Sequence, residues 1–140
     1  MDERMLAATG DLAKGTNIVS LWNPQSDNPA NQQFVKAFTE KYNRKPTVYA
    51  AQSYDTARLI GAALKTTGGN LKDIQAYRAA MQNVKFDSIR GNFRFAQNRH
   101  PVIDWYLLQV QAGADGKLTE VPIKTLATDH VDSFAAQCTL

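Results

Sequence analysis

The stretch from Asn28 to Gly69 constrains the fold most strongly, because residues that start or stop helices stand at its two ends and in its middle. Asn28 is a good N-cap residue, and Pro29 takes the first helical position, where a missing N–H costs nothing. Asn43-Arg44-Lys45-Pro46 breaks the chain, since Pro46 restricts the residue before it. Gly68-Gly69 ends the stretch. Two helices are therefore expected between these breaks.

Both helices have an apolar face. In the first, predicted over about 29–42, Phe34, Phe38 and Tyr42 recur every fourth residue and form one stripe. The second, predicted over about 50–66, has a broad apolar face rich in small residues. We expect both helices to pack closely against neighbouring elements.

Short apolar and alternating segments on either side of these helices predict strands. Residues 17–22 form an apolar run between Gly15 and Pro24, which predicts a buried strand. The order of elements predicts an α/β fold with three helices, one buried strand and a β-hairpin-like C-terminal region. The remaining elements are a helix over 72–83, a strand over 91–95, and a hairpin of 104–111 and 117–125 that turns at Asp115-Gly116.

Composition excludes several classes of function. The 140 residues carry a net charge of +3 with the signs interspersed, so no basic surface for nucleic acid is expected. The single cysteine, Cys138, cannot form an internal disulfide, and neither His100 nor His130 has a partner at metal-ligand spacing. The sequence therefore predicts no metal site, no cofactor and no nucleic-acid partner. No segment approaches the roughly 20 apolar residues of a membrane span.

Motifs for catalysis are also missing. No Gly-x-Ser-x-Gly elbow, phosphate loop or dinucleotide fingerprint is present. A hydrolase would have to use Asp55, Asp104 and His100, and this alternative requires the three side chains to converge in one cleft. We therefore expect a protein that is not an enzyme.

Aromatic and amide residues near the ends of elements are the candidate ligand contacts. Trp22 and Asn23 close the first predicted strand, and Tyr49, Gln52 and Ser53 open the second helix. A helix N-terminus offers free N–H groups to a polar ligand, and an adjacent aromatic ring can cover the apolar part of that ligand. Alternatively, Trp22 and Tyr49 pack between strand and helix.

The order and spacing of several runs resemble the periplasmic solute-binding proteins of branched-chain amino-acid-type ABC transporters. The likeness extends over essentially the whole chain, but it corresponds only to the C-terminal portion of that family's type I periplasmic binding protein fold. The runs that carry it are Asn28-Pro29-Ala30-Asn31 with Phe34, Phe38, Tyr42 and Pro46; Tyr49 to Ala57 followed by Gly68-Gly69; Phe86 to Phe95; and Trp105 to Gly113.

The resemblance implies an architecture of two lobes with the ligand trapped between them. Residues 1–21 would end lobe two, 22–28 would form a crossover or hinge, 29–103 would complete lobe one, and 104–140 would return through the hinge and end in a tail. It also implies an aromatic wall at Tyr49. Trp22 and Asn23 follow as crossover contacts, and Gln52 and Ser53 are weaker candidates.

The function implied is that of a periplasmic receptor that captures a small polar or aromatic solute, such as an amino acid, an aromatic acid or an amide, for an ABC importer. Its partners would be the solute and the transporter's permease. The start of this chain lacks the apolar core of a secretory signal, so a signal peptide would lie outside it. A ligand-sensing regulatory module with a protein partner is the alternative. As a fragment, the chain would expose apolar helix faces and strand edges, so self-association or domain swapping is expected.

Overall fold

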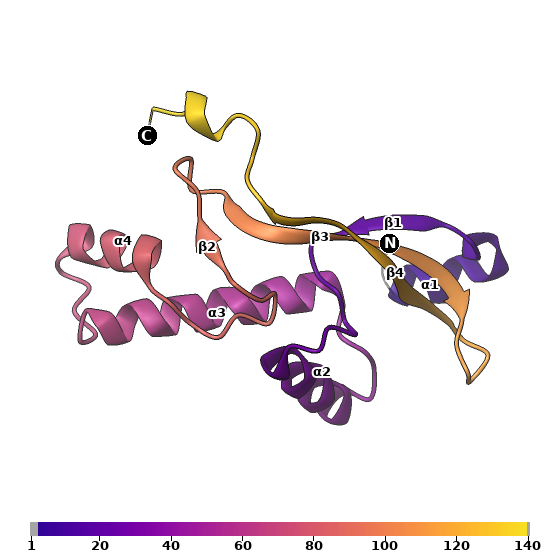
Figure 1. Ribbon diagram of the computed structural model, residues 1–140. Coiled ribbons are helices and arrows are strands. Elements are labelled where there is room, and N and C mark those ends of the chain that lie inside the picture. The colour runs from indigo at the N-terminus through magenta and orange to yellow at the C-terminus, as the bar shows by residue number, and fades with distance from the viewer. Residues whose placement is uncertain (1–2, 140) are drawn as a thin grey trace.

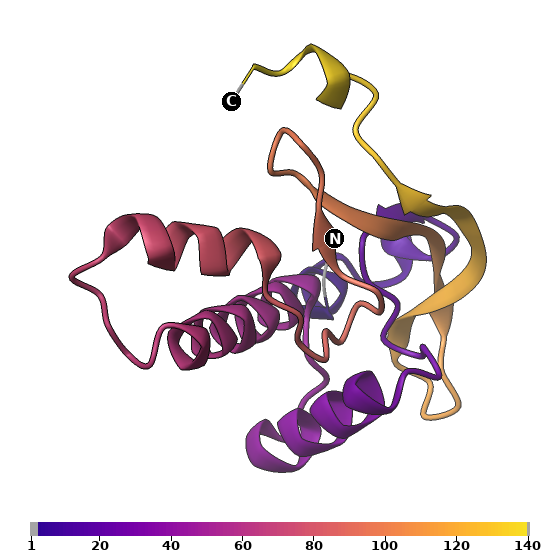
Figure 2. The same ribbon diagram turned by 60° about the vertical axis from the view of Figure 1, so that its left-hand side comes forward.

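The computed structural model describes residues 3–139, which form four helices and a four-stranded antiparallel sheet (Figure 1). The helices α2, α3 and α4 lie to one side of the long β3–β4 ribbon, and α1 lies beside that ribbon (Figure 2). The elements are α1 (Glu3–Thr9), β1 (Asn17–Ser20), α2 (Pro29–Tyr42), α3 (Val48–Thr66), α4 (Ile74–Asn83), β2 (Arg94–Phe95), β3 (Pro101–Ala112) and β4 (Leu118–His130), with short 3₁₀ helices at Gly10–Ala13 and Ala135–Gln137. The α/β fold class is therefore confirmed.

The predicted helix boundaries of the Asn28–Gly69 stretch are confirmed by their caps. The side chain of Asn28 accepts a hydrogen bond from Ala30 N at 2.9 Å, and Pro29 is the first residue of α2. At the other end, Gly68 and Gly69 both have positive φ, which stops α3 at Thr66. The one difference is that α3 begins at Val48, two residues earlier than predicted. Thr47 caps it by accepting from Ala50 N.

The strand β3 organises the sheet, since every other strand pairs with it in antiparallel fashion. β1 pairs with the middle of β3, where Val19 lies opposite Leu107, and β2 pairs with the start of β3. β4 follows it from Ile103 to Ala112, and the pairing shifts register at three points between Ile103 and Leu108. Such bulges increase the local twist of a strand pair. The predicted C-terminal hairpin is confirmed, and both of its strands are longer than expected.

The predicted burial of the first strand is wrong. The strand is present as β1, but Val19 is 60% exposed and only Ser20 is buried among its four residues. β1 pairs with β3 alone, so among residues 3–139 no strand occupies its other edge. The apolar run correctly predicted a strand. It could not show whether another part of the chain packs over that strand.

The predicted strand over 91–95 is also shorter than expected. Only Arg94 and Phe95 pair with β3, because Gly91 adopts a φ of 91° in a tight turn that begins at Ser88. Alternation alone did not reveal this turn.

Trp22 lies at the centre of the core that joins the helices to the sheet. It is 3% exposed and packs with Phe34, Ala51 and Ile89. Its Nε1 donates a hydrogen bond of 2.7 Å to Oδ1 of Asn31, which is fully buried. A buried indole N–H and a buried amide oxygen thus satisfy each other. A second core cluster of Leu6, Ala13 and Val110 lies between α1 and the sheet.

Trp22→Phe should lower the free energy of unfolding by about 1–3 kcal/mol, because the ring packing is largely kept while Asn31 Oδ1 loses its donor in the core. Urea denaturation measures the change. Tyr49→Phe is the control, since Tyr49 is 64% exposed and its hydroxyl should contribute less than about 0.5 kcal/mol. Equal effects of the two substitutions would contradict a stabilising Trp22–Asn31 hydrogen bond.

Candidate functional site

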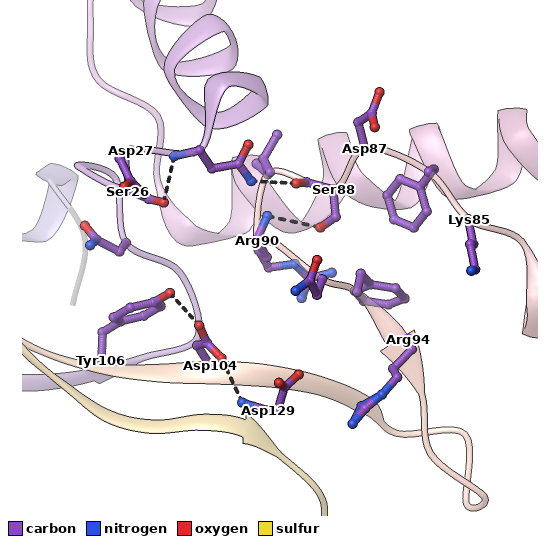
Figure 3. Close-up of a pocket in the computed structure, with 17 residues that line it drawn as sticks. Ser26, Asp27, Lys85, Asp87, Ser88, Arg90, Arg94, Asp104, Tyr106 and Asp129 are labelled. Atoms are coloured by element: carbon purple, nitrogen blue, oxygen red, sulfur yellow. Dashed lines mark hydrogen bonds between the residues drawn. The ribbon is translucent and has the colours of Figure 1, made fainter.

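A cleft of about 860 Å³ opens where the loop before α2, the segment 85–94 and the β3–β4 ribbon meet (Figure 3). Three parts of the chain distant in sequence line it. The loop contributes Asn23 and residues 26–28, and the ribbon contributes Asp104, Tyr106 and Asp129. All residues from Lys85 to Arg94 line the remaining side. The cleft therefore spans the junction between the helical and the sheet parts of the chain.

Side chains of both charge signs line the cleft: the basic ones come from one wall, which also carries Asp87, and the other acidic ones come from the remaining walls. Lys85 and Arg94 belong to the segment 85–94, whereas Asp27, Asp104 and Asp129 come from the loop and the ribbon (Figure 3). The rings of Phe86, Phe93 and Tyr106 add apolar surface between them. A small solute with an anionic end, an aromatic body and a hydrogen-bond donor would find complementary groups here.

Tyr106 and Asp104 form a polar pair in the ribbon wall. The Tyr106 hydroxyl donates to Asp104 Oδ2 at 3.3 Å, and the backbone N–H of Asp129 donates to Asp104 Oδ1 at 2.8 Å. Burial, followed by the charge of Asp104, raises the pKa of Tyr106 from 10.0 to about 12. The phenol therefore stays protonated and able to donate. The protonated Tyr106 hydroxyl contributes fully to the stability of the fold below pH 10, and this contribution is lost as the pH rises towards 12.

Hydrogen bonds hold the turn Ser88–Arg90 of the opposite wall. Asn28 Nδ2 donates to the carbonyl of Ser88 at 2.8 Å, which ties the turn to the start of α2. On α3, Asp55 accepts from Arg90 Nε at 2.9 Å in an ion pair whose side chains are almost fully buried. The cleft is thus built on residues that α2 and α3 position.

The structure does not bring the five predicted contact residues together. Trp22 is a core residue, as the packing alternative had it. Asn23 lines the cleft, although its Oδ1 already accepts from Gln25 N at 2.8 Å. Gln52 lines a second cavity of about 350 Å³, and Tyr49 and Ser53 are exposed outside both. Tyr49 is the second residue of α3 and is 64% exposed.

The residues that line most of the cleft were not identified as contacts from sequence. The run Phe86–Phe95 stood out only by its resemblance to a family segment, and Tyr106 was seen only as part of a strand. The turn at Gly91 folds the run into a wall, and the pairing of β3 with β4 brings Tyr106 and Asp129 to the same cleft. The signal available in the sequence was the density of charged and aromatic residues in 85–94.

The three side chains required by the hydrolase alternative do not share this cleft. Asp104 lines it, but neither Asp55 nor His100 does. Asp55 is paired with Arg90, and His100 Nδ1 lies 3.2 Å from Asp132 at the start of the C-terminal segment. Within residues 3–139, no group of three or more His, Cys, Asp or Glu side chains is placed to hold a metal ion. In the same part of the chain, no helix combines the length and apolar character needed to cross a membrane.

Asp104→Asn should lower the pKa of Tyr106 from about 12 part of the way towards 10, because the phenolate would no longer form beside a carboxylate while its burial remains. The ultraviolet absorbance of tyrosinate, taken as the difference between each protein and its Tyr106→Phe counterpart, follows the titration. Asp87→Asn is the control: it removes a carboxylate from the same cleft that does not act on Tyr106. An unchanged pKa in Asp104→Asn would show that the carboxylate has no influence on the phenol.

Residues 1–117 match the family model described as periplasmic binding protein. No curated protein matches the chain.

Solved structures are similar over nearly the whole chain. A solute-binding protein of an ABC transporter from Rhodopseudomonas palustris, in complex with benzoate, superposes with a TM-score of 0.87 at 32% identity, over 100% of this chain and 37% of its own. An ABC transporter substrate-binding protein from Sphaerobacter thermophilus gives 0.81 at 29%, over 91% and 35%. A solute-binding protein from R. palustris HaA2, in complex with p-hydroxybenzoic acid, gives 0.80 at 27%, over 99% and 38%. The chain thus spans little more than a third of the length of these relatives.

Proposed function

Because this chain belongs to the periplasmic binding protein family, we propose that it supplies part of the solute site of a receptor for small aromatic carboxylates, such as 4-hydroxybenzoate. The cleft at the junction of helices and ribbon carries this proposal, since it combines cations and aromatic rings on the segment 85–94 with acceptors on the loop and the ribbon opposite. Several relatives more than 25% identical to this chain are complexes with benzoate, p-hydroxybenzoic acid or 4-hydroxybenzoate.

The solute would lie across the cleft with its two ends on different walls. Its carboxylate would pair with Lys85 and Arg94, neither of which makes an ion pair or side-chain hydrogen bond with another residue in the range 3–139. Its ring would lie among Phe86, Phe93 and Tyr106. A hydroxyl at the far end would donate to Asp27 or Asp129, which favours a hydroxybenzoate over benzoate.

The proposed division of the chain into two lobes and their connections would allow closure around the solute. Under this proposal, residues 1–21 end one lobe, 29–103 complete the other, and 22–28 and 104–140 connect them. The cleft takes lining residues from both connections and from the lobe formed by 29–103. A change in the angle between the lobes would therefore change the distance between its walls.

The proposed role involves binding without chemical conversion. The receptor would act in the periplasm and deliver its solute to the permease of an ABC transporter. Three solved relatives are named as ABC transporter solute-binding or substrate-binding proteins, and this naming supports the assignment of the partner.

Arg94→Gln, made in the protein that carries this sequence, should weaken the binding of 4-hydroxybenzoate and benzoate about tenfold, because a charge-assisted hydrogen bond is lost. Isothermal titration calorimetry measures both affinities, with leucine as a solute that lacks the ring. The matched control is Arg78→Gln, which removes an exposed arginine outside the cleft and should leave both affinities unchanged.

Two results would count against the proposal. If none of the three solutes binds the wild-type protein, the receptor function for this class is wrong. If leucine binds more tightly than the two aromatic acids, the assignment of solute class is wrong.

We also propose that these 140 residues associate with a second copy through the open edge of β1. No strand within the described part of the chain pairs with this edge, and Asn17–Ser20 contains neither a charge nor a proline that would protect it. Two copies could extend the sheet by pairing β1 with β1 around a two-fold axis.

Val19→Lys should shift the chain from dimer to monomer, because a charge at a strand edge opposes further pairing. Analytical ultracentrifugation over a range of concentrations measures the change. Ile74→Lys introduces the same charge at an exposed apolar position on α4 and should leave the dimer intact. A wild-type chain that stays monomeric at high concentration would rule out this association.

A further inference from the structure

A residue that does not line the cleft holds one of its walls from behind. Asp55 of α3 is 1% exposed, and its carboxylate accepts three hydrogen bonds from consecutive residues of the turn 88–90. The donors are Ser88 Oγ at 2.6 Å, Ile89 N at 3.0 Å and Arg90 Nε at 2.9 Å. All three donor residues line the cleft, whereas Asp55 does not.

Because this network is buried, its hydrogen bonds tolerate little displacement of the turn. The side chains of Asp55 and Arg90 are 0% and 9% exposed, so neither charge is well solvated. A buried ion pair persists only where further hydrogen bonds satisfy its remaining atoms. Ser88 Oγ and Ile89 N meet that requirement at the carboxylate. Movement of the turn away from α3 would therefore leave a buried charge without partners.

A second anchor fixes the same turn from α2. The carbonyl of Ser88 accepts from Asn28 Nδ2, while Asn28 Oδ1 caps the first turn of α2. Ile89, which is 1% exposed, packs against Trp22 and Phe34 in the core. The turn is thus held by α2, by α3 and by the core, and its remaining side faces the cleft (Figure 3).

We infer that Asp55 is a positioning residue for solute binding: it holds the turn 88–90 in the conformation that completes the cleft. This inference rests on the proposed receptor function. A residue with a purely structural role would lower stability and leave the affinity for solute unchanged. A positioning residue changes the affinity as well, since a small displacement of a binding wall weakens every contact made to it.

The substitution Asp55→Asn tests the inference in the protein that carries this sequence. The asparagine oxygen can still accept from Ile89 N, but its amide N–H groups would face Arg90 Nε as donor against donor. We expect the affinity for 4-hydroxybenzoate to fall about tenfold. We also expect faster amide hydrogen exchange at Ile89 and Arg90, because their turn loses its anchor.

Two further variants separate positioning from stability. Val110→Ala removes buried volume in the second core cluster, away from the cleft, and should lower stability without changing the affinity or the exchange of the turn. Ser88→Ala removes the hydroxyl that donates to Asp55 and accepts from Arg90 N, so it loosens the same turn, and it serves if Asp55→Asn fails to fold. Its expected loss of affinity is about threefold.

The outcomes distinguish this inference from the proposed function. If the wild-type protein binds solute and Asp55→Asn and Ser88→Ala bind it equally well, the inference is overturned while the proposed function stands. If the wild-type protein binds none of the three solutes, the proposed function fails, and the inferred role in solute binding fails with it. Amide exchange that stays slow in a folded Asp55→Asn protein would also overturn the inference.

Discussion

Hydrogen bonding along both edges of β3 is the constraint on which the rest of the structure depends. β4 pairs with β3 from Ile103 to Ala112, β1 pairs with Tyr106 to Gln109 along the opposite edge, and β2 pairs with Pro101 and Val102 at the start of the strand. β3 begins beside the helices, where β2 leads into it, and ends beside α1 and the second core cluster. One continuous strand therefore determines how the helical part and the sheet part of the chain face each other. The cleft lies where these parts meet.

The elements that the sequence predicted well are those with local chemical signals. Asn28 and Pro29 start α2, Gly68-Gly69 ends α3, and Asp115-Gly116 turns the hairpin. Each of these signals acts through the conformation or hydrogen bonds of a few neighbouring residues. Their effect can therefore be judged without knowing the rest of the fold.

The features that the sequence did not reveal depend on contacts between distant segments. Trp22 packs against Phe34, Ala51 and Ile89, and Asn31, nine residues later, accepts its N–H, whereas Tyr49 lies exposed in the first turn of α3. The pairing of Asp55 with residues 88–90 joins positions more than thirty residues apart. No local pattern marks such a pair. Of the contact residues named from the sequence, only Asn23 lines the cleft, and none of the lining residues of the segment 85–94 was named.

Family membership and cleft chemistry support the proposed function in different ways. The family match establishes the class of protein, while the combination of Lys85 and Arg94 with aromatic rings and with acidic residues on the facing walls bears on the kind of solute. The two lines of evidence are independent, because the match says nothing of which side chains line the cleft of this chain.

The register shifts between β3 and β4 have a mechanical consequence. They lie between Ile103 and Leu108, the part of the ribbon that carries Asp104 and Tyr106 into the cleft. A strand pair with bulges is twisted more strongly than a regular pair, and the regular spacing of its hydrogen bonds is interrupted at each bulge. A rotation of the helices against the sheet would change this twist rather than break the ribbon. The cleft wall formed by Asp104 and Tyr106 thus lies on the most irregular part of the ribbon.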